Sequence, residues 1–258
     1  MYKRQLLLGQ VLPENTYRRV LVPIIWQMCI FILLGTSLNL TLGYLGQLTL
    51  GHMGFAGVGA YTAALTSLAL ERAGLFEASE AAPGQLILVI LGCCLLGAIF
   101  AGLLGLLVGI PALRLRGDYL AIVTLAFGEI IKNIINILYV GVDENGLHFS
   151  TSSEAALNLS ETGKAILKGP MGVTANVKLS SFTAGFLLVM VALIVVLNLV
   201  NSRSGRAIMA LRDNRIAAES VGISATKYKL MAFVTSAVLA GAAGALYAMN
   251  YSLSLIHI

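Results

Sequence analysis

Several long apolar runs, almost free of charge, constrain this chain more than any other feature. An α-helix needs about 20 residues to cross the hydrocarbon core of a bilayer, and these runs have that length. Hydrocarbon offers the backbone no hydrogen-bond partners, so such runs fold as helices. The sequence therefore predicts an all-α fold, a polytopic integral membrane helical bundle with a single transmembrane domain over 1–258. Its expected membrane segments are 20–42, 47–70, 85–110, 118–140, 181–200 and 230–249.

Composition excludes a soluble domain. Hydrophobic residues make up 58% of the chain and charged residues 11%, whereas soluble domains average about 25% charged residues. The net charge of +5 lies in loops beside the apolar runs, where basic residues set membrane orientation, so it does not indicate nucleic-acid binding. Cys29, Cys93 and Cys94 lie inside apolar runs without metal-ligand spacing. We expect them to be packed in the bundle, and we expect neither a metal site nor a cofactor.

The segment 201–229 is the most polar stretch between two apolar runs and carries far more basic than acidic residues. Short basic loops beside membrane helices stay in the cytoplasm, so this loop is expected inside. It also has the pattern of one helix, with Ser204 as N-cap and Gly222 as the left-handed stop. Arg212 and Glu219, seven residues apart, would share one face of that helix. The segment is either a docking surface or a solvated linker.

A glycine-rich segment, 43–70, is too rich in glycine for one straight helix and too apolar for an aqueous loop. It predicts a broken or re-entrant helix, because non-helical backbone at membrane depth is tolerated where protein buries it or a cavity adjoins it. His52 in this segment is interpreted as either a packed hydrogen-bonding group or part of a site. The residues of this region expected along a substrate path are Asn39, Gly43, Gln47, Gly51, His52 and Tyr61.

The number of membrane crossings raises a question about the first segments. Counting back from the cytoplasmic loop places 71–84 outside, and the charge-balanced segment 141–180 is expected outside as well. If the first two apolar segments both cross, the basic residues of 1–19 also lie outside, against the positive-inside rule. Either the glycine-rich segment is re-entrant, or a helix is missing upstream.

Glu129 is a charged residue inside an apolar run. It lies 11 residues after Asp118, which places it roughly 16 Å into the bilayer at ~1.5 Å per residue. A charge at that depth costs about 3 kcal/mol, so Glu129 is expected to face a partner or a cavity. Lys132, Asn133 and Asn136 follow at helical spacing and are expected on the same face. This stripe is either a structural ion pair between helices or the lining of a substrate route.

The sequence carries no arrangement typical of catalysis. No GxSxG motif accompanies His52, and no glycine-rich loop has the spacing that holds phosphates. The chain is therefore expected not to be an enzyme, and any ATP must be bound by another chain. An intramembrane enzyme built around His52 is the weakest alternative, because it would need a second catalytic group at matching depth.

Three long runs resemble a known family: LNLTLGYLGQLTLGHMGFAGVGAYTAAL at 38–65, LRLRGDYLAIVTLAFGEIIKNIIN at 113–136, and SRSGRAIMALRDNRIAAESVGISATKYKLMAFVTSAVLAGAAGALYA at 202–248. They are similar to the inner-membrane permease of bacterial branched-chain amino acid ABC importers, of the LivM type. The resemblance implies a multi-pass protein of the bacterial inner membrane. It also implies three protein partners: cytoplasmic ATPase subunits, a second related permease and an extracytoplasmic amino-acid-binding protein.

On this resemblance 201–229 would be the coupling loop, with a coupling helix that docks on the ATPase. The residues that match the family's docking pattern are Gly205, Arg206, Ala210, Arg212, Asn214, Ala217, Ala218, Glu219, Gly222 and Ile223. The alternative function is a secondary transporter or channel that uses the stripe of Glu129 and Lys132 as an ion relay.

The chain departs from the family at both ends and in the outer loop. Family members begin with an additional apolar helix and continue with further spans beyond the position of Ala248. The outer-loop motif, with paired glycines in the family, is GPMGVT at 169–174. We therefore expect the sequence to be truncated at both ends.

Overall fold

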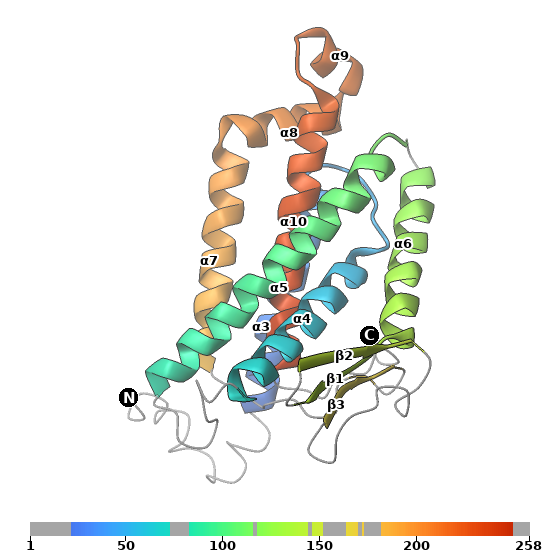
Figure 1. Cartoon of the computed structure of the whole chain (residues 1–258). Coiled ribbons are helices and arrows are strands. Elements are labelled where there is room, and N and C mark those ends of the chain that lie inside the picture. The colour runs from blue at the N-terminus through green and yellow to red at the C-terminus, as the bar shows by residue number, and fades with distance from the viewer. Residues whose placement is uncertain are drawn as a thin grey trace.

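A computed structural model describes residues 22–72, 83–115, 118–143, 146–151, 164–169, 172 and 182–249. Within these residues lie six helices that are long and apolar enough to cross a membrane. They are α3 (Val22–Asn39), α4 (His52–Arg72), α5 (Pro83–Ala112), α6 (Asp118–Ile137), α7 (Phe182–Asn201) and α10 (Ala225–Ala248). The helices run in alternating directions, and α5 crosses the bundle obliquely (Figure 1). The all-α membrane bundle expected from the sequence is confirmed.

Helix α10 forms the centre of the bundle, packed against α3, α4 and α5. The contacts are close because glycines face backbone there: a Cβ on Gly59 would overlap the carbonyl oxygen of Gly241, and one on Gly244 would overlap that of Ala56. Small residues allow this approach in a membrane, where packing rather than water drives helix association. The lipid-facing side is apolar, as shown by exposed Leu88 and Leu107 on α5.

Helices α6 and α7 lie at opposite edges of the bundle (Figure 1) and are less buried than α10. Much of their exposed surface is apolar, including Ile122 and Ile134 on α6 and Phe186 and Ile194 on α7. In a bilayer these side chains face lipid or another protein.

The glycine-rich segment separates two helices rather than breaking one. After α3 the chain makes a π-helical turn, η2 (Leu40–Tyr44), and residues 45–51 are non-helical before α4 begins. Helices α3 and α4 run antiparallel (Figure 1), and each has the length and composition of a span. The re-entrant alternative is therefore not the arrangement in this structure. Residues 1–19, on which the crossing conflict rested, lie outside the described residues.

A small antiparallel sheet stands at the end of α6, within the segment expected as a polar outer loop. Its strands are β1 (Tyr139–Asp143), β2 (Gly146–Ser150) and β3 (Lys164–Lys168), in the order β2–β1–β3. Val140 of β1 joins the buried cluster of the bundle, so the sheet is anchored to the membrane helices. As a result α6 ends at Ile137, before the expected end at residue 140.

The basic segment lies at the opposite end of the bundle from the sheet and forms two helices, α8 (Arg203–Asp213) and α9 (Arg215–Ser220) (Figure 1). The expectation of a single helix was wrong. The helix is interrupted at Asn214, which has an extended backbone and whose side-chain oxygen accepts a hydrogen bond from the N–H of Ala217. Such capping satisfies a free N–H at the start of a helix and competes with helix continuation.

The N-cap of the basic segment also differs from the expectation. Ser202, not Ser204, accepts a hydrogen bond from the N–H of Gly205 at 3.1 Å, and Ser204 lies inside α8. The reason is that α7 continues to Asn201, so the chain turns at Ser202 itself. The left-handed stop is confirmed, because Gly222 follows α9 with a φ of 86°.

Candidate functional site

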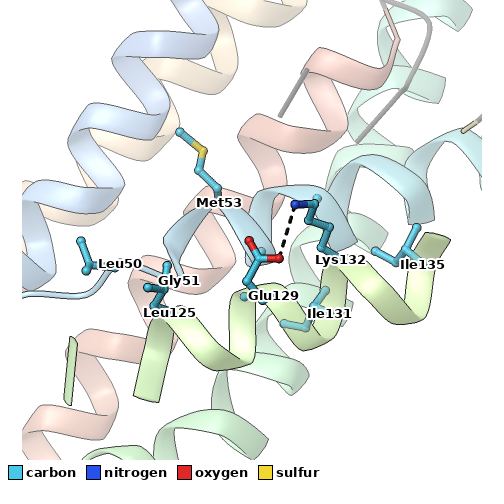
Figure 2. A pocket seen from close by; sticks show the side chains of 11 residues that line it. Leu50, Gly51, Met53, Leu125, Glu129, Ile131, Lys132 and Ile135 are labelled. Atoms are coloured by element: carbon cyan, nitrogen blue, oxygen red, sulfur yellow. Dashed lines mark hydrogen bonds and ion pairs between the residues drawn. The ribbon is translucent and has the colours of Figure 1, made fainter. Parts of the chain in front are cut away.

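A groove of ≈ 200 Å³ lies between the start of α4 and α6 (Figure 2). This volume is below the roughly 300 Å³ of pockets for drug-sized ligands, so the groove suits a small solute. Most of its walls are apolar, and Glu129 and Lys132 are the only titratable residues among those that line it. The lining residues are Leu50, Gly51, Met53, Gly54, Gly57, Leu125, Gly128, Glu129, Ile131, Lys132 and Ile135.

Glu129 and Lys132 form an ion pair on the groove side of α6. Lys132 Nζ lies 3.3 Å from Glu129 Oε2, and the two side chains are 46% and 56% exposed, respectively. Glu129 thus has a charged partner and lines a groove, but the partner lies on the same helix, so the ion pair does not join two helices as one alternative expected. The half exposure matters because a charge at membrane depth is costly unless water or another protein surrounds it. Asn133 and Asn136, expected beside them, do not line the groove.

The groove is narrow at its base because backbone meets backbone there. Gly51 packs so closely on α6 that a Cβ would overlap the carbonyl oxygen of Thr124, and a Cβ on Gly128 would lie 3.2 Å from the Cα of Gly51. Leu50 donates its N–H to Thr124 Oγ1 at 3.2 Å. This bond satisfies a backbone donor of the non-helical stretch, as burial in a membrane requires.

His52 begins α4 but is buried in the bundle rather than in the groove. The Ser37 hydroxyl donates to the carbonyl oxygen of Ser236 at 3.0 Å. With its single proton used there, Ser37 Oγ, 2.6 Å away, accepts from His52 Nε2. His52 is thus a packed hydrogen-bonding group that joins three helices. This arrangement gives no support to an intramembrane enzyme.

The other expected path residues are dispersed. Asn39 lines a second groove of ≈ 440 Å³, between α3 and α7. Gly43 lies in η2, and Gln47 is half-buried in the non-helical stretch. Tyr61 is buried in the main core, and its hydroxyl has no hydrogen-bond partner among the described residues. Of the expected path residues, the structure brings together only Gly51, Glu129 and Lys132 in one groove.

The end of the bundle formed by α8 and α9 presents apolar side chains. Ile216, within α9, is 81% exposed, and Val221, directly after the end of α9, is 76% exposed. Both side chains lie outside the apolar spans, in the segment that was expected to dock on another protein. Sequence reasoning missed both residues because it searched this segment for charge, and an isolated Ile among alanines and polar residues was the available signal.

The residues expected in the docking pattern divide by burial. Gly205 and Ala218 are buried and hold α8 and α9 in place, while Ala210 and Ile223 are half-buried. The exposed members are Arg206, Arg212, Asn214, Ala217, Glu219 and Gly222. The expectation that Arg212 and Glu219 share one face was wrong, because the break at Asn214 places them on different helices. Glu219 pairs with Arg215 at 2.8 Å.

A family model described as the branched-chain amino acid transport system permease component matches residues 20–256. The chain belongs to this permease family. The match covers every described helix, and its members are transport components. With six apolar helices, the chain is a multi-pass protein of the inner membrane.

Two curated relatives within the family carry the same name, high-affinity branched-chain amino acid transport system permease protein LivM. The one from Salmonella typhimurium is 36% identical over 230 residues, 85% of this chain and 50% of the relative. The one from Escherichia coli K12 is 35% identical over the same shares. The chain thus spans about half the length of these family members. No solved structure matches it.

Proposed function

We propose that this chain acts as a transmembrane permease subunit of an ATP-driven importer for branched-chain amino acids. The observation that carries the proposal is the pair of helices at one end of the bundle: α8 lies across that end and α9 stands out from it (Figure 1), and Ile216 and Val221 are exposed there. A permease without its own nucleotide site needs a surface through which an ATPase subunit can move it. We assign that role to these two helices, and place them on the cytoplasmic side because of their basic charge.

The groove between α4 and α6 is the proposed substrate route. Its ion pair is half exposed at membrane depth, which favours coverage by a second permease over contact with lipid. The route would then lie between the two permeases, lined on this side by α4 and α6. An extracytoplasmic binding protein would deliver the amino acid from the end that carries the sheet.

The lining of the groove is chemically complementary to an amino acid with an apolar side chain. An amino-acid zwitterion carries an ammonium and a carboxylate close together. Glu129 can pair with the ammonium and Lys132 with the carboxylate, and these two contacts then replace the ion pair between Glu129 and Lys132. Met53, Leu125 and Ile135 offer apolar surface for the substrate side chain (Figure 2). An ion relay, the alternative function, needs a series of titratable groups across the membrane, and the groove provides one pair.

The docking role is tested in the intact importer with Ile216→Asp. A carboxylate on the apolar contact should release the ATPase subunits during affinity purification of the permease and abolish ATP-dependent leucine uptake. Thr226→Asp is the matched control, because Thr226 is exposed on the first turn of α10, where a negative charge is favourable. If Ile216→Asp retains the ATPase and the uptake of the wild type, α8 and α9 are not the docking surface.

A further inference from the structure

Arg212 turns back toward the membrane helices instead of outward to a partner. Its Nη1 donates a hydrogen bond to the carbonyl oxygen of Gly43 at 3.0 Å, across 169 positions of sequence. The bond joins α8 to η2, the π-helical turn that ends the first span. Arg212 is therefore positioned to connect the docking helices with the non-helical stretch.

The Gly43 carbonyl lies where a helix leaves acceptors unsatisfied. Earlier carbonyls of this turn accept from the chain itself: Leu40 O from the N–H of Leu45 at 3.3 Å, and Thr41 O from that of Gln47 at 3.0 Å. Gly43 follows them at the C-terminal end of the helix, which carries partial negative charge. A guanidinium both donates to this end and complements its charge.

The stem of Arg212 lies across the turn that follows. Gly46 has a φ of 69°, and a Cβ there would lie 2.6 Å from Arg212 Cγ. On the opposite side, Asp213 Oδ1 accepts from both Nε and Nη2 of Arg212 at 3.1 Å. The side chain is thus held by an acid on its own helix and by the turn it covers.

An apolar contact reinforces this junction. Leu45, 3% exposed, forms a buried cluster with Ile208 of α8 and Ala232 of α10. The start of the non-helical stretch is therefore fixed to α8 by one polar and one apolar contact. Its other end forms the wall of the groove, where Leu50 is bonded to Thr124 of α6.

We infer that Arg212 is a positioning residue that transmits movement of α8 and α9 to the groove through residues 43–51. The inference rests on the proposed function, because it requires an ATPase that moves these helices. The non-helical stretch runs from the α8 end of the bundle to α6 (Figure 1). A displacement of α8 would pull on Gly43 and shift Leu50 and Gly51 against α6.

The test measures leucine uptake and ATP hydrolysis together, in proteoliposomes that contain the intact importer and its binding protein. Arg212→Gln should keep the ATPase subunits bound and ATP hydrolysis active, while the leucine imported per ATP falls by about five- to tenfold. Arg212→Lys retains a cationic donor for Gly43 O and should restore part of the ratio. Arg203→Gln is the control, because it removes an exposed charge from the first turn of α8.

The outcomes separate this inference from the proposed function. Wild-type protein that binds no ATPase would overturn the proposed function, and the inference with it. A functional wild type with an unchanged ratio in Arg212→Gln would overturn the inference alone. Loss of the bound ATPase in Arg212→Gln would also overturn it, since Arg212 would then act at the docking surface. A lower ratio in Arg203→Gln equal to that in Arg212→Gln would overturn it too, by showing a general effect of charge.

Discussion

Ser37 and Ser236, 199 positions apart, each donate a hydrogen bond to the other's backbone carbonyl oxygen, at 3.0 and 2.7 Å. The two bonds cross-link α3 with the central helix α10 at a buried point. His52 adds α4 to the same network through Ser37 Oγ. The network lies beside the non-helical stretch, so it fixes the ends of α3 and α4 on either side of the break.

The two serines should contribute unequally to stability. Ser236→Ala removes one bond between helices, worth about 0.6 kcal/mol in membrane proteins. Ser37→Ala also leaves His52 Nε2 buried without its partner, which costs about 1–3 kcal/mol. The free energy of unfolding in detergent micelles should therefore fall more for Ser37→Ala. Equal losses would show that His52 finds another partner in the variant.

Glycine packing around α10 gives a second prediction. Gly244→Ala places a Cβ against the backbone of Ala56, whereas Gly92→Ala on α5 meets nothing within 4 Å. We expect Gly244→Ala to lower the free energy of unfolding by about 1–3 kcal/mol through overpacking, and Gly92→Ala to be neutral or slightly stabilising. Comparable destabilisation by both would mean that close approach of backbone at Gly244 does not decide the effect.

Local rules predicted the membrane helices, because span length and apolar character are set by the bilayer. They also predicted the left-handed stop at Gly222, since few residues other than glycine adopt that φ. The local rules could not decide whether Ser202 or Ser204 is the N-cap. It depends on where α7 ends, and α7 continues without a sequence signal.

Features that depend on distant residues were missed. Arg212 was expected to face a partner, but its hydrogen bond to Gly43 is visible only once α8 lies against η2. The strands β1 and β2 were overlooked although the sequence has Asn-Gly, a common hairpin signal, at 145–146, and β2 begins at Gly146. Each strand has only five residues, too few for alternation to stand out beside the long spans.

Gly222 should tolerate only residues that accept its left-handed conformation. A side chain there has free space, so the cost of substitution comes from the φ of 86° alone. We expect Gly222→Val to reduce ATPase co-purification while leaving membrane insertion intact, because the valine displaces the end of α9. Gly222→Asn, which adopts this conformation more readily, should retain most binding. Equal behaviour of the two variants would contradict a conformational role.

The topology predicts that the two ends of the bundle lie on opposite sides of the membrane. Ser220 on α9 and Thr151 after β2 are exposed and suit single-cysteine labelling. The native Cys29, Cys93 and Cys94 are buried and should react little even before they are replaced. An impermeant thiol reagent added to intact spheroplasts should label Thr151→Cys and spare Ser220→Cys. Labelling in the reverse pattern would place α8 and α9 outside.

The ion pair in the groove should be more sensitive to loss of one partner than to exchange of the two. Glu129→Ala or Lys132→Ala leaves a single charge at membrane depth, which costs about 3 kcal/mol unless a substrate or partner neutralises it. Each should reduce leucine uptake by the intact importer. The exchanged variant Glu129→Lys/Lys132→Glu preserves both charges within the same groove and should recover part of the uptake.

A structural role and a substrate-binding role of the ion pair predict different protein levels and KM values for the exchanged variant. If the pair only stabilises α6, the exchange restores the amount of protein in the membrane and the KM for leucine stays constant throughout. If the pair binds the zwitterion, the exchange restores the protein level but leaves the KM raised, because the ammonium and carboxylate sites have changed places. Asn133→Ala is the control, since Asn133 is exposed on the same helix outside the groove lining. Normal protein level and normal KM in both single variants would exclude the groove from the substrate route.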